Sequence, residues 1–184
     1  DPRVPVTTGW DLGVSDSTAI WFVQQVGQEV RWIDYYQASG VGLDHYAKVV
    51  LGKPYTYDRH NLPHDVEVRE MSTGNTRTDM LKGLGIRPSI GKKLHVNDGI
   101  SAMRSLLPRS WFDETNCALG IRALTEYTKE RIEDEDGPDG EPQYRDKPYH
   151  NWTSHGADAA RTLALGLRPI RERSALTYPR LAIA

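Results

Sequence analysis

The feature that most constrains this chain is an aspartate inside an otherwise apolar strand pattern, in the segment Gly9-Trp10-Asp11-Leu12-Gly13. A turn rich in Ser, Asp and Thr follows, and a second apolar run begins at Ala19. A buried strand carries a carboxylate only where it is paired or holds a metal ion. Flanking glycines let a ligand approach the backbone closely. The pattern therefore indicates a site at Asp11, with the alternative that Asp11 ends the strand and hydrogen-bonds the turn.

Apolar runs at the start of the chain predict a three-stranded antiparallel meander. The strands are expected over residues 4–11, 19–26 and 30–37. The later two are rich in Trp, Tyr, Ile and Val, and Gly27-Gln28 between them is a hairpin turn signal.

Helical spacing dominates the rest of the chain. Helices are expected over residues 43–51, 76–84, 100–107, 115–131 and 152–167. We expect Asn97-Asp98 to cap the third of them and Asn151 or Thr153 to cap the last. Short extended runs are expected over residues 62–68, 86–90 and 111–113, a polar loop over 55–60, and a mobile loop or β-hairpin over 134–149. This order predicts an α/β fold, in which a mixed sheet joins the meander to parallel strands and carries helices on both faces.

Size and composition predict one domain with its own core. The chain has 184 residues, of which 38% are hydrophobic and 26% charged. We expect residues 1–168 to form the domain and 169–184 a tail or linker. No apolar run is long enough for a membrane span, and no signal peptide is recognisable. Because the chain does not begin with Met, we expect it to be part of a longer protein. The single cysteine, Cys117, excludes an internal disulfide and is expected to be a small core residue.

The formal net charge of −2 does not exclude a nucleic-acid partner, because the acids are concentrated. Residues 126–141 hold eight acids and two bases, which leaves 17 acids and 21 bases in the rest of the chain. The acidic window is expected to be a solvated loop that faces away from any polyanion.

Two further aspartates stand at positions suited to a shared site. Asp65 lies in a short apolar run at a point where a strand turns towards its helix, and ligands gather at such strand ends. Asp158 lies on the final helix among small residues that allow the helix to pack against the sheet. Each has a simpler alternative, since Asp65 can cap its loop and Asp158 can pair with Arg161. Three acids at one end of a sheet repel each other unless a cation lies between them, and Mg²⁺ or Mn²⁺ favours such oxygen ligands.

These motifs resemble the C-terminal nuclease domain of the large terminase subunit of tailed bacteriophages, which has a ribonuclease-H-like fold. The resemblance covers about residues 6–168. It rests on the segment around Asp11, on Leu62-Pro63-His64-Asp65, and above all on the Ser-His-x-x-Asp-Ala-x-Arg pattern from Ser154 to Arg161.

The resemblance implies a metal-dependent endonuclease that cuts concatemeric double-stranded DNA during genome packaging in the host cytoplasm. Asp11, Asp65 and Asp158 would be the catalytic acids and the ligands of Mg²⁺ or Mn²⁺, with two ions expected. Asp16 is a candidate accessory ligand or a turn cap, and His155 can orient a carboxylate or a water, or make a structural hydrogen bond. The implied partners are an N-terminal ATPase motor, the small terminase subunit and the portal. No phosphate-binding Gly-x-x-x-x-Gly-Lys motif is present, so this part of the protein would cut but not translocate DNA.

Basic residues around two glycine-containing loops are candidate DNA contacts. They are Arg77, Lys82, Arg87, Lys92 and Lys93. The alternative is a solvated basic surface.

Two other functions stay open from the sequence. One is a ribonuclease-H-like resolvase or exonuclease with the same metal chemistry, which would prefer branched DNA or free ends. The other is a non-catalytic module that docks DNA or the portal, for which metal binding would be weak or absent.

Overall fold

The computed structural model describes residues 1–13, 16–67, 76–136 and 140–167. Within these ranges, the side chains of Asp65, Glu67 and residues 133–136 are not described. The predicted tail over 169–184 and the loop around Gly74 lie outside the described residues. The strands are β1 (Val6–Asp11), β2 (Thr18–Val26), β3 (Glu29–Ala38), β4 (Tyr57–Leu62), β5 (Pro88–Ile90), β6 (Ser110–Phe112), β7 (Lys129–Asp136) and β8 (Pro142–Pro148). The helices are α1 (Leu43–Gly52), α2 (Arg77–Gly83), α3 (Val96–Leu106), α4 (Ala118–Glu126) and α5 (Trp152–Gly166), with short 3₁₀ helices η1 (His64–Glu67) and η2 (Leu107–Arg109).

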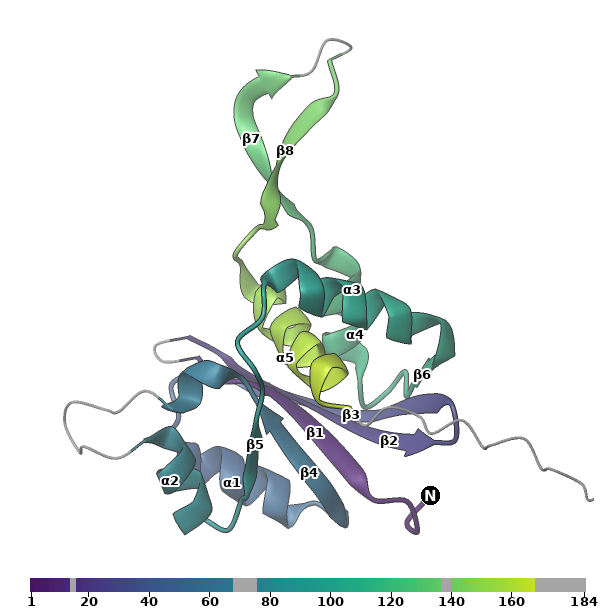
Figure 1. Cartoon of the computed structure of the whole chain (residues 1–184), viewed down its shortest axis with the longest axis vertical. Helices are drawn as coiled ribbons and strands as arrows, with labels where there is room; N and C mark the ends of the chain where they lie inside the picture. The colour runs from purple at the N-terminus through teal and green to yellow at the C-terminus, as the bar shows by residue number, and fades with distance from the viewer. Residues whose placement is uncertain (14–15, 68–75, 137–139, 168–184) are drawn as a thin grey trace, which may run out of the picture.

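The predicted mixed sheet is confirmed. Its strand order is β5-β4-β1-β2-β3-β6, in which β1, β2 and β3 form the antiparallel meander. The strands β4 and β5 continue the sheet parallel to β1, and β6 pairs in parallel with β3. Helices α1 and α2 cover one face, and α3, α4 and α5 cover the other (Figure 1).

Strand alternation divides the core between the two faces. On β1 and β2, Trp10, Ile20 and Phe22 point towards α1 and α2. Ala19 and Trp21 alternate with them and pack under α5. The tryptophan ring of Trp21 is fully buried and lies edge-on to Trp32, with ring centroids 4.9 Å apart.

The sequence prediction was wrong about the segment before Asp65. The strand β4 covers residues 57–62, although a loop was expected over 55–60, and Asp65 lies in η1, although an extended run was expected over 62–68. Pro63 has no backbone donor to continue the sheet, so the chain leaves it there. Asp65 consequently lies just beyond the carboxyl end of β4 rather than inside a strand.

The long helix predicted over 115–131 was also wrong at both ends. The helix α4 covers only Ala118–Glu126, because Asp113 accepts hydrogen bonds from the backbone amides of Thr115 and Asn116 and holds a turn before it. After α4 the chain becomes β7, which pairs with β8 as a hairpin. The hairpin alternative for 134–149 is therefore confirmed. The hairpin projects away from the sheet on the side covered by α3, α4 and α5 (Figure 1).

The predicted caps are corrected at α3 and confirmed at α5. His95 caps α3, with Asp98 completing the capping box from inside the helix. Asn151 caps α5 together with Ser154. Cys117 is fully buried, as predicted, and its thiol donates to the Trp32 carbonyl. No helix among the described residues is long and apolar enough to cross a membrane.

A buried histidine makes the stability of this fold depend on pH. Burial lowers the pKa of His60 from 6.5 to about 4. Its Nδ1 lies 2.8 Å from the Thr8 hydroxyl, which also accepts a hydrogen bond from Trp10, so the neutral ring fits this site as the acceptor. The unfolded chain binds a proton first as the pH falls through 6.5, so stability is lost from there down to about 4.

The wild type should lose about 3 kcal/mol of unfolding free energy between pH 6.5 and 4 because of the difference between the unfolded and folded pKa values of His60. We expect this part of the loss to be absent in His60→Gln. Urea unfolding of both proteins across this range measures the difference. His64→Gln, at an exposed position, is measured over the same pH range as the control for substituting a histidine. Parallel profiles for wild type and His60→Gln would contradict the assignment.

Candidate metal centre

The site is created by the close packing of α5 on β1. A Cβ atom placed on Gly9 would lie 2.3 Å from Leu163 Cβ and 2.7 Å from the Ala159 carbonyl oxygen, so only glycine permits this approach. The indole of Trp21 donates to the Gly156 carbonyl at 2.8 Å and fixes the first part of the helix on the sheet. Asp11 lies two residues after Gly9 and shares its face of β1, so its carboxylate meets α5.

Two of the predicted residues, Asp11 and Asp16, contact opposite nitrogens of the His155 ring. The His155 ring is buried, with Nδ1 3.2 Å from Asp11 Oδ2 and Nε2 3.2 Å from Asp16 Oδ1. The hydrogen bond with Asp11 raises the pKa of His155, against the opposing effect of burial. Asp16 also accepts the backbone amide of Ser17, and this bond, followed by the charge of His155, lowers the pKa of Asp16. Asp16 thus has its predicted turn contact and also contacts the site.

Sequence reasoning did not single out His150. Its Nε2 lies 3.6 Å from Asp16 Oδ2, and its ring centroid lies 5.9 Å from that of His155. The residue belongs to the segment directly before α5, so its place next to the predicted motif was the one available signal.

Asp158 lies on α5 beside Arg161, as the simpler alternative expected. Arg161 Nη2 is 2.5 Å from Asp158 Oδ1, and this oxygen has no other partner in the described residues. Burial raises the pKa of Asp158 to about 6, with a further rise from the Asp11 carboxylate, while Arg161 opposes both. The two carboxylates are therefore close enough to interact electrostatically, and pairing with Arg161 does not offset the cost of burying Asp158.

The backbone of Asp65 lies at the same end of the sheet as Asp11, where β1 and β4 have their carboxyl ends. The strands β1 and β4 are parallel neighbours, with Gly9 opposite Asn61, so their carboxyl ends coincide. Asp65 follows the end of β4, as Asp11 ends β1. Among the described side chains, which do not include that of Asp65, no three His, Cys, Asp or Glu residues are grouped so as to hold a metal ion.

The basic candidates are not gathered at one place. Arg77 begins α2 and its Nη1 lies 3.4 Å from the Leu12 carbonyl, next to Asp11. Lys82 lies 3.8 Å from Asp79 on an exposed face of α2. Arg87, Lys92 and Lys93 are exposed between α2 and α3.

Solved structures that are similar to this chain include nuclease domains of phage large terminases. The bacteriophage P22 domain has a TM-score of 0.63 and 15% identity over 90% of this chain and 82% of its own. The bacteriophage SPP1 domain, which was solved with bound Mn, has a TM-score of 0.59 and 19% identity over 86% of this chain and 84% of its own. The nuclease of thermophilic phage G20c with bound magnesium has a TM-score of 0.58 and 11% identity over 89% and 82%.

A large terminase from a thermophilic bacteriophage also matches 89% of this chain, with a TM-score of 0.63 and 15% identity, but the chain spans only 40% of that protein. No family model and no curated protein sequence matches the chain. The predicted resemblance to terminase nuclease domains is confirmed at the level of the ribonuclease-H-like fold.

Proposed function

We propose that this chain is a metal-dependent nuclease domain that hydrolyses phosphodiester bonds in double-stranded DNA during phage genome packaging. The proposal rests on Asp11, at the carboxyl end of β1, which lies against α5 through His155 and close enough to Asp158 for its charge to raise the pKa of Asp158, in a fold shared with terminase nucleases of which two contain Mn or magnesium. Asp65, which follows the carboxyl end of the neighbouring strand β4, is the proposed third acid. Cutting of concatemers within duplex DNA, rather than at branches or ends, follows from the same likeness.

The residues present fit a hard divalent cation. Asp158 has a raised pKa because it is buried near a second carboxylate, and the ion pair with Arg161 does not cancel this rise. A cation relieves the cost of burying the two carboxylates together, and the donor set is oxygen, as Mg²⁺ and Mn²⁺ favour. We propose two such ions, which would activate the attacking water and stabilise the leaving oxygen.

The other side chains of the site position these acids. His155 holds one oxygen of Asp11 and leaves the other available, which is the usual role of a residue behind a metal ligand. Asp16 fixes the opposite nitrogen of the same ring and is a candidate accessory ligand. Arg77, beside Leu12, is the best placed of the basic residues to contact a DNA phosphate, and Lys82, Lys92 and Lys93 are proposed to contact DNA further from the acids.

The partners of the domain follow from the same likeness. Since the chain spans 40% of a large terminase, we infer that an ATPase motor in the same polypeptide delivers the DNA, with the small subunit and the portal as further partners in the host cytoplasm.

Cleavage of supercoiled plasmid tests the proposal. We expect nicked and linear DNA with Mg²⁺ or Mn²⁺ and none with EDTA, and we expect the products to disappear for Asp11→Asn. Asp44→Asn, at an exposed site on α1, should cut like the wild type. Cutting that survives EDTA or the loss of Asp11 would exclude the mechanism.

A further inference from the structure

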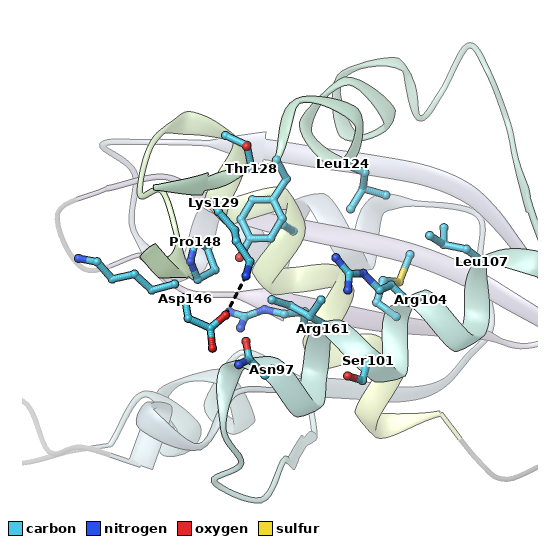
Figure 2. Close-up of a pocket in the computed structure, with 15 residues that line it drawn as sticks. Asn97, Ser101, Arg104, Leu107, Leu124, Thr128, Lys129, Asp146, Pro148 and Arg161 are labelled. Carbon is cyan, nitrogen blue, oxygen red and sulfur yellow. Dashed lines mark hydrogen bonds and ion pairs between the residues drawn. The ribbon is translucent and has the colours of Figure 1, made fainter. Parts of the chain in front are cut away.

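A pocket of about 390 Å³ lies at the base of the β7–β8 hairpin, bordered by α3, the end of α4 and α5 (Figure 2). Among the described side chains, neither Asp11, Asp158 nor His155 lines it, although Arg161 lines the pocket and also contacts Asp158. Its volume is within the range of roughly 300–1,000 Å³ that small-molecule sites occupy. The pocket is therefore a candidate binding site beside the candidate metal centre.

One part of the pocket wall is apolar. It is formed by Ile100, Met103, Leu107, Leu124, Tyr127 and Pro148. Leu107 remains 45% exposed, so part of this wall is open to solvent. Such a wall suits the face of a planar, weakly polar group, for which an aromatic ring is a favourable neighbour.

Two guanidinium groups border the same cavity, from Arg104 on α3 and Arg161 on α5 (Figure 2). The Arg104 side chain makes no ion pair or hydrogen bond with any described residue. Arg161 is already engaged, because its Nη2 lies 2.5 Å from Asp158 Oδ1 and its Nη1 donates to the Val96 carbonyl, and only its buried Nε has no hydrogen-bond partner among the described residues. The pocket therefore has one free guanidinium group, that of Arg104, of the kind that holds phosphate groups.

The other charges in the lining are largely balanced. Lys129 Nζ lies 2.8 Å from Asp146 Oδ1, and Lys147 Nζ lies 2.6 Å from Glu130 Oε2. Since Lys129 neutralises Asp146, this carboxylate does little to oppose an anion. The unbalanced charge of the pocket is positive and comes from Arg104.

We propose that this pocket binds a nucleotide 5′-phosphate, with the phosphate on Arg104 and the base against the apolar wall. The same chemistry is offered by a free mononucleotide and by the 5′-phosphorylated end of a DNA strand. The combination of a compact cavity, an apolar wall and a single free guanidinium group favours this ligand over a longer acidic peptide. The proposal does not depend on metal binding or on cleavage.

Calorimetric titration of the whole chain with dAMP in EDTA tests the site. Arg104→Ala is expected to weaken binding about 10-fold or more, since a charged hydrogen-bonding group is lost. The matched control is Arg109→Ala, which follows α3 and does not line the pocket. Arg161 is left intact in these variants because it also contacts Asp158.

A second pair of variants changes the space without changing the charge. Ser101→Phe places a ring in the pocket and should abolish binding, whereas Ser105→Phe, on the same exposed helix surface outside the lining, should not. Circular dichroism shows whether each variant keeps its fold.

Titrations with further ligands distinguish a free mononucleotide from a 5′-phosphorylated DNA end as the natural ligand of the pocket. Tighter binding of a 5′-phosphorylated than of a 5′-hydroxyl oligonucleotide would identify the strand end, and binding of dAMP alone would identify the free nucleotide. The proposal is overturned if dAMP does not bind, if Arg104→Ala binds it like the wild type, or if inorganic phosphate binds as tightly. Because EDTA prevents metal-dependent cutting, such a failure would leave the proposed nuclease function untouched.

Discussion

Asp158→Asn is expected to lower plasmid cleavage by about 10³-fold, the scale of losing a group that stabilises charge in the transition state. The substitution replaces one carboxylate oxygen by an amide, which removes a negative charge from the site that we propose holds the metal ions. The variant should also lose the stabilisation that Mn²⁺ gives the wild type, because a metal that binds only the folded state raises its melting temperature.

The stability of the metal-free variant distinguishes this result from unfolding. In the wild type, burial and the neighbouring Asp11 raise the pKa of Asp158 to about 6, so the carboxylate is still mostly ionised at neutral pH but its charge costs more free energy than in water. The amide avoids this cost but gives up the ion pair with Arg161, and these effects oppose each other. We expect the melting temperature in EDTA to change little. Asp44→Asn serves as the exposed control, and full cleavage by Asp158→Asn would remove Asp158 from the site.

The parts of the fold that were predicted correctly are those where local pattern and tertiary environment agree. The meander was predicted because Trp10, Ile20 and Trp21 follow strand alternation and each face of the sheet buries them. The final helix was predicted because Asn151 caps it and its small residues match close packing on the sheet.

The errors occurred where distant partners decide the structure. Residues 55–60 look like a polar loop, but β1 on one side and β5 on the other supply hydrogen-bond partners that make residues 57–62 a strand. The end of the predicted long helix becomes β7 because its backbone pairs with β8, and the ion pairs Lys129–Asp146 and Glu130–Lys147 lie across this hairpin. Residue types alone do not reveal such pairing.

The candidate site was predictable in its acids and not in their surroundings. An aspartate in an apolar strand and another among small helical residues are conspicuous in a sequence, whereas the place of His150 beside Asp16 depends on how the chain enters α5. The pocket beside Arg104 joins four segments that are distant in the sequence, so no local pattern indicates it.

Gly9→Ala is expected to lower the unfolding free energy by about 3 kcal/mol, at the upper end of the cost of overpacking a core. The new methyl group would lie 2.3 Å from Leu163 Cβ and 2.7 Å from the Ala159 carbonyl oxygen, and neither atom can move without moving α5. Gly83→Ala is the matched control, because a Cβ atom there meets open space at the end of α2. Urea unfolding should show that this control is as stable as the wild type or slightly more stable.

The same substitution tests how the site is built. If α5 moves away from β1, Asp158 and His155 move relative to Asp11, and a displacement of about 1 Å can cost about 100-fold in rate. Cleavage by the folded fraction of Gly9→Ala should therefore fall as well, at a temperature where most of the protein is folded. A stable variant would show that the helix can adjust around the methyl group. A destabilised variant with full activity would show that contacts other than the close approach at Gly9 keep the acids together.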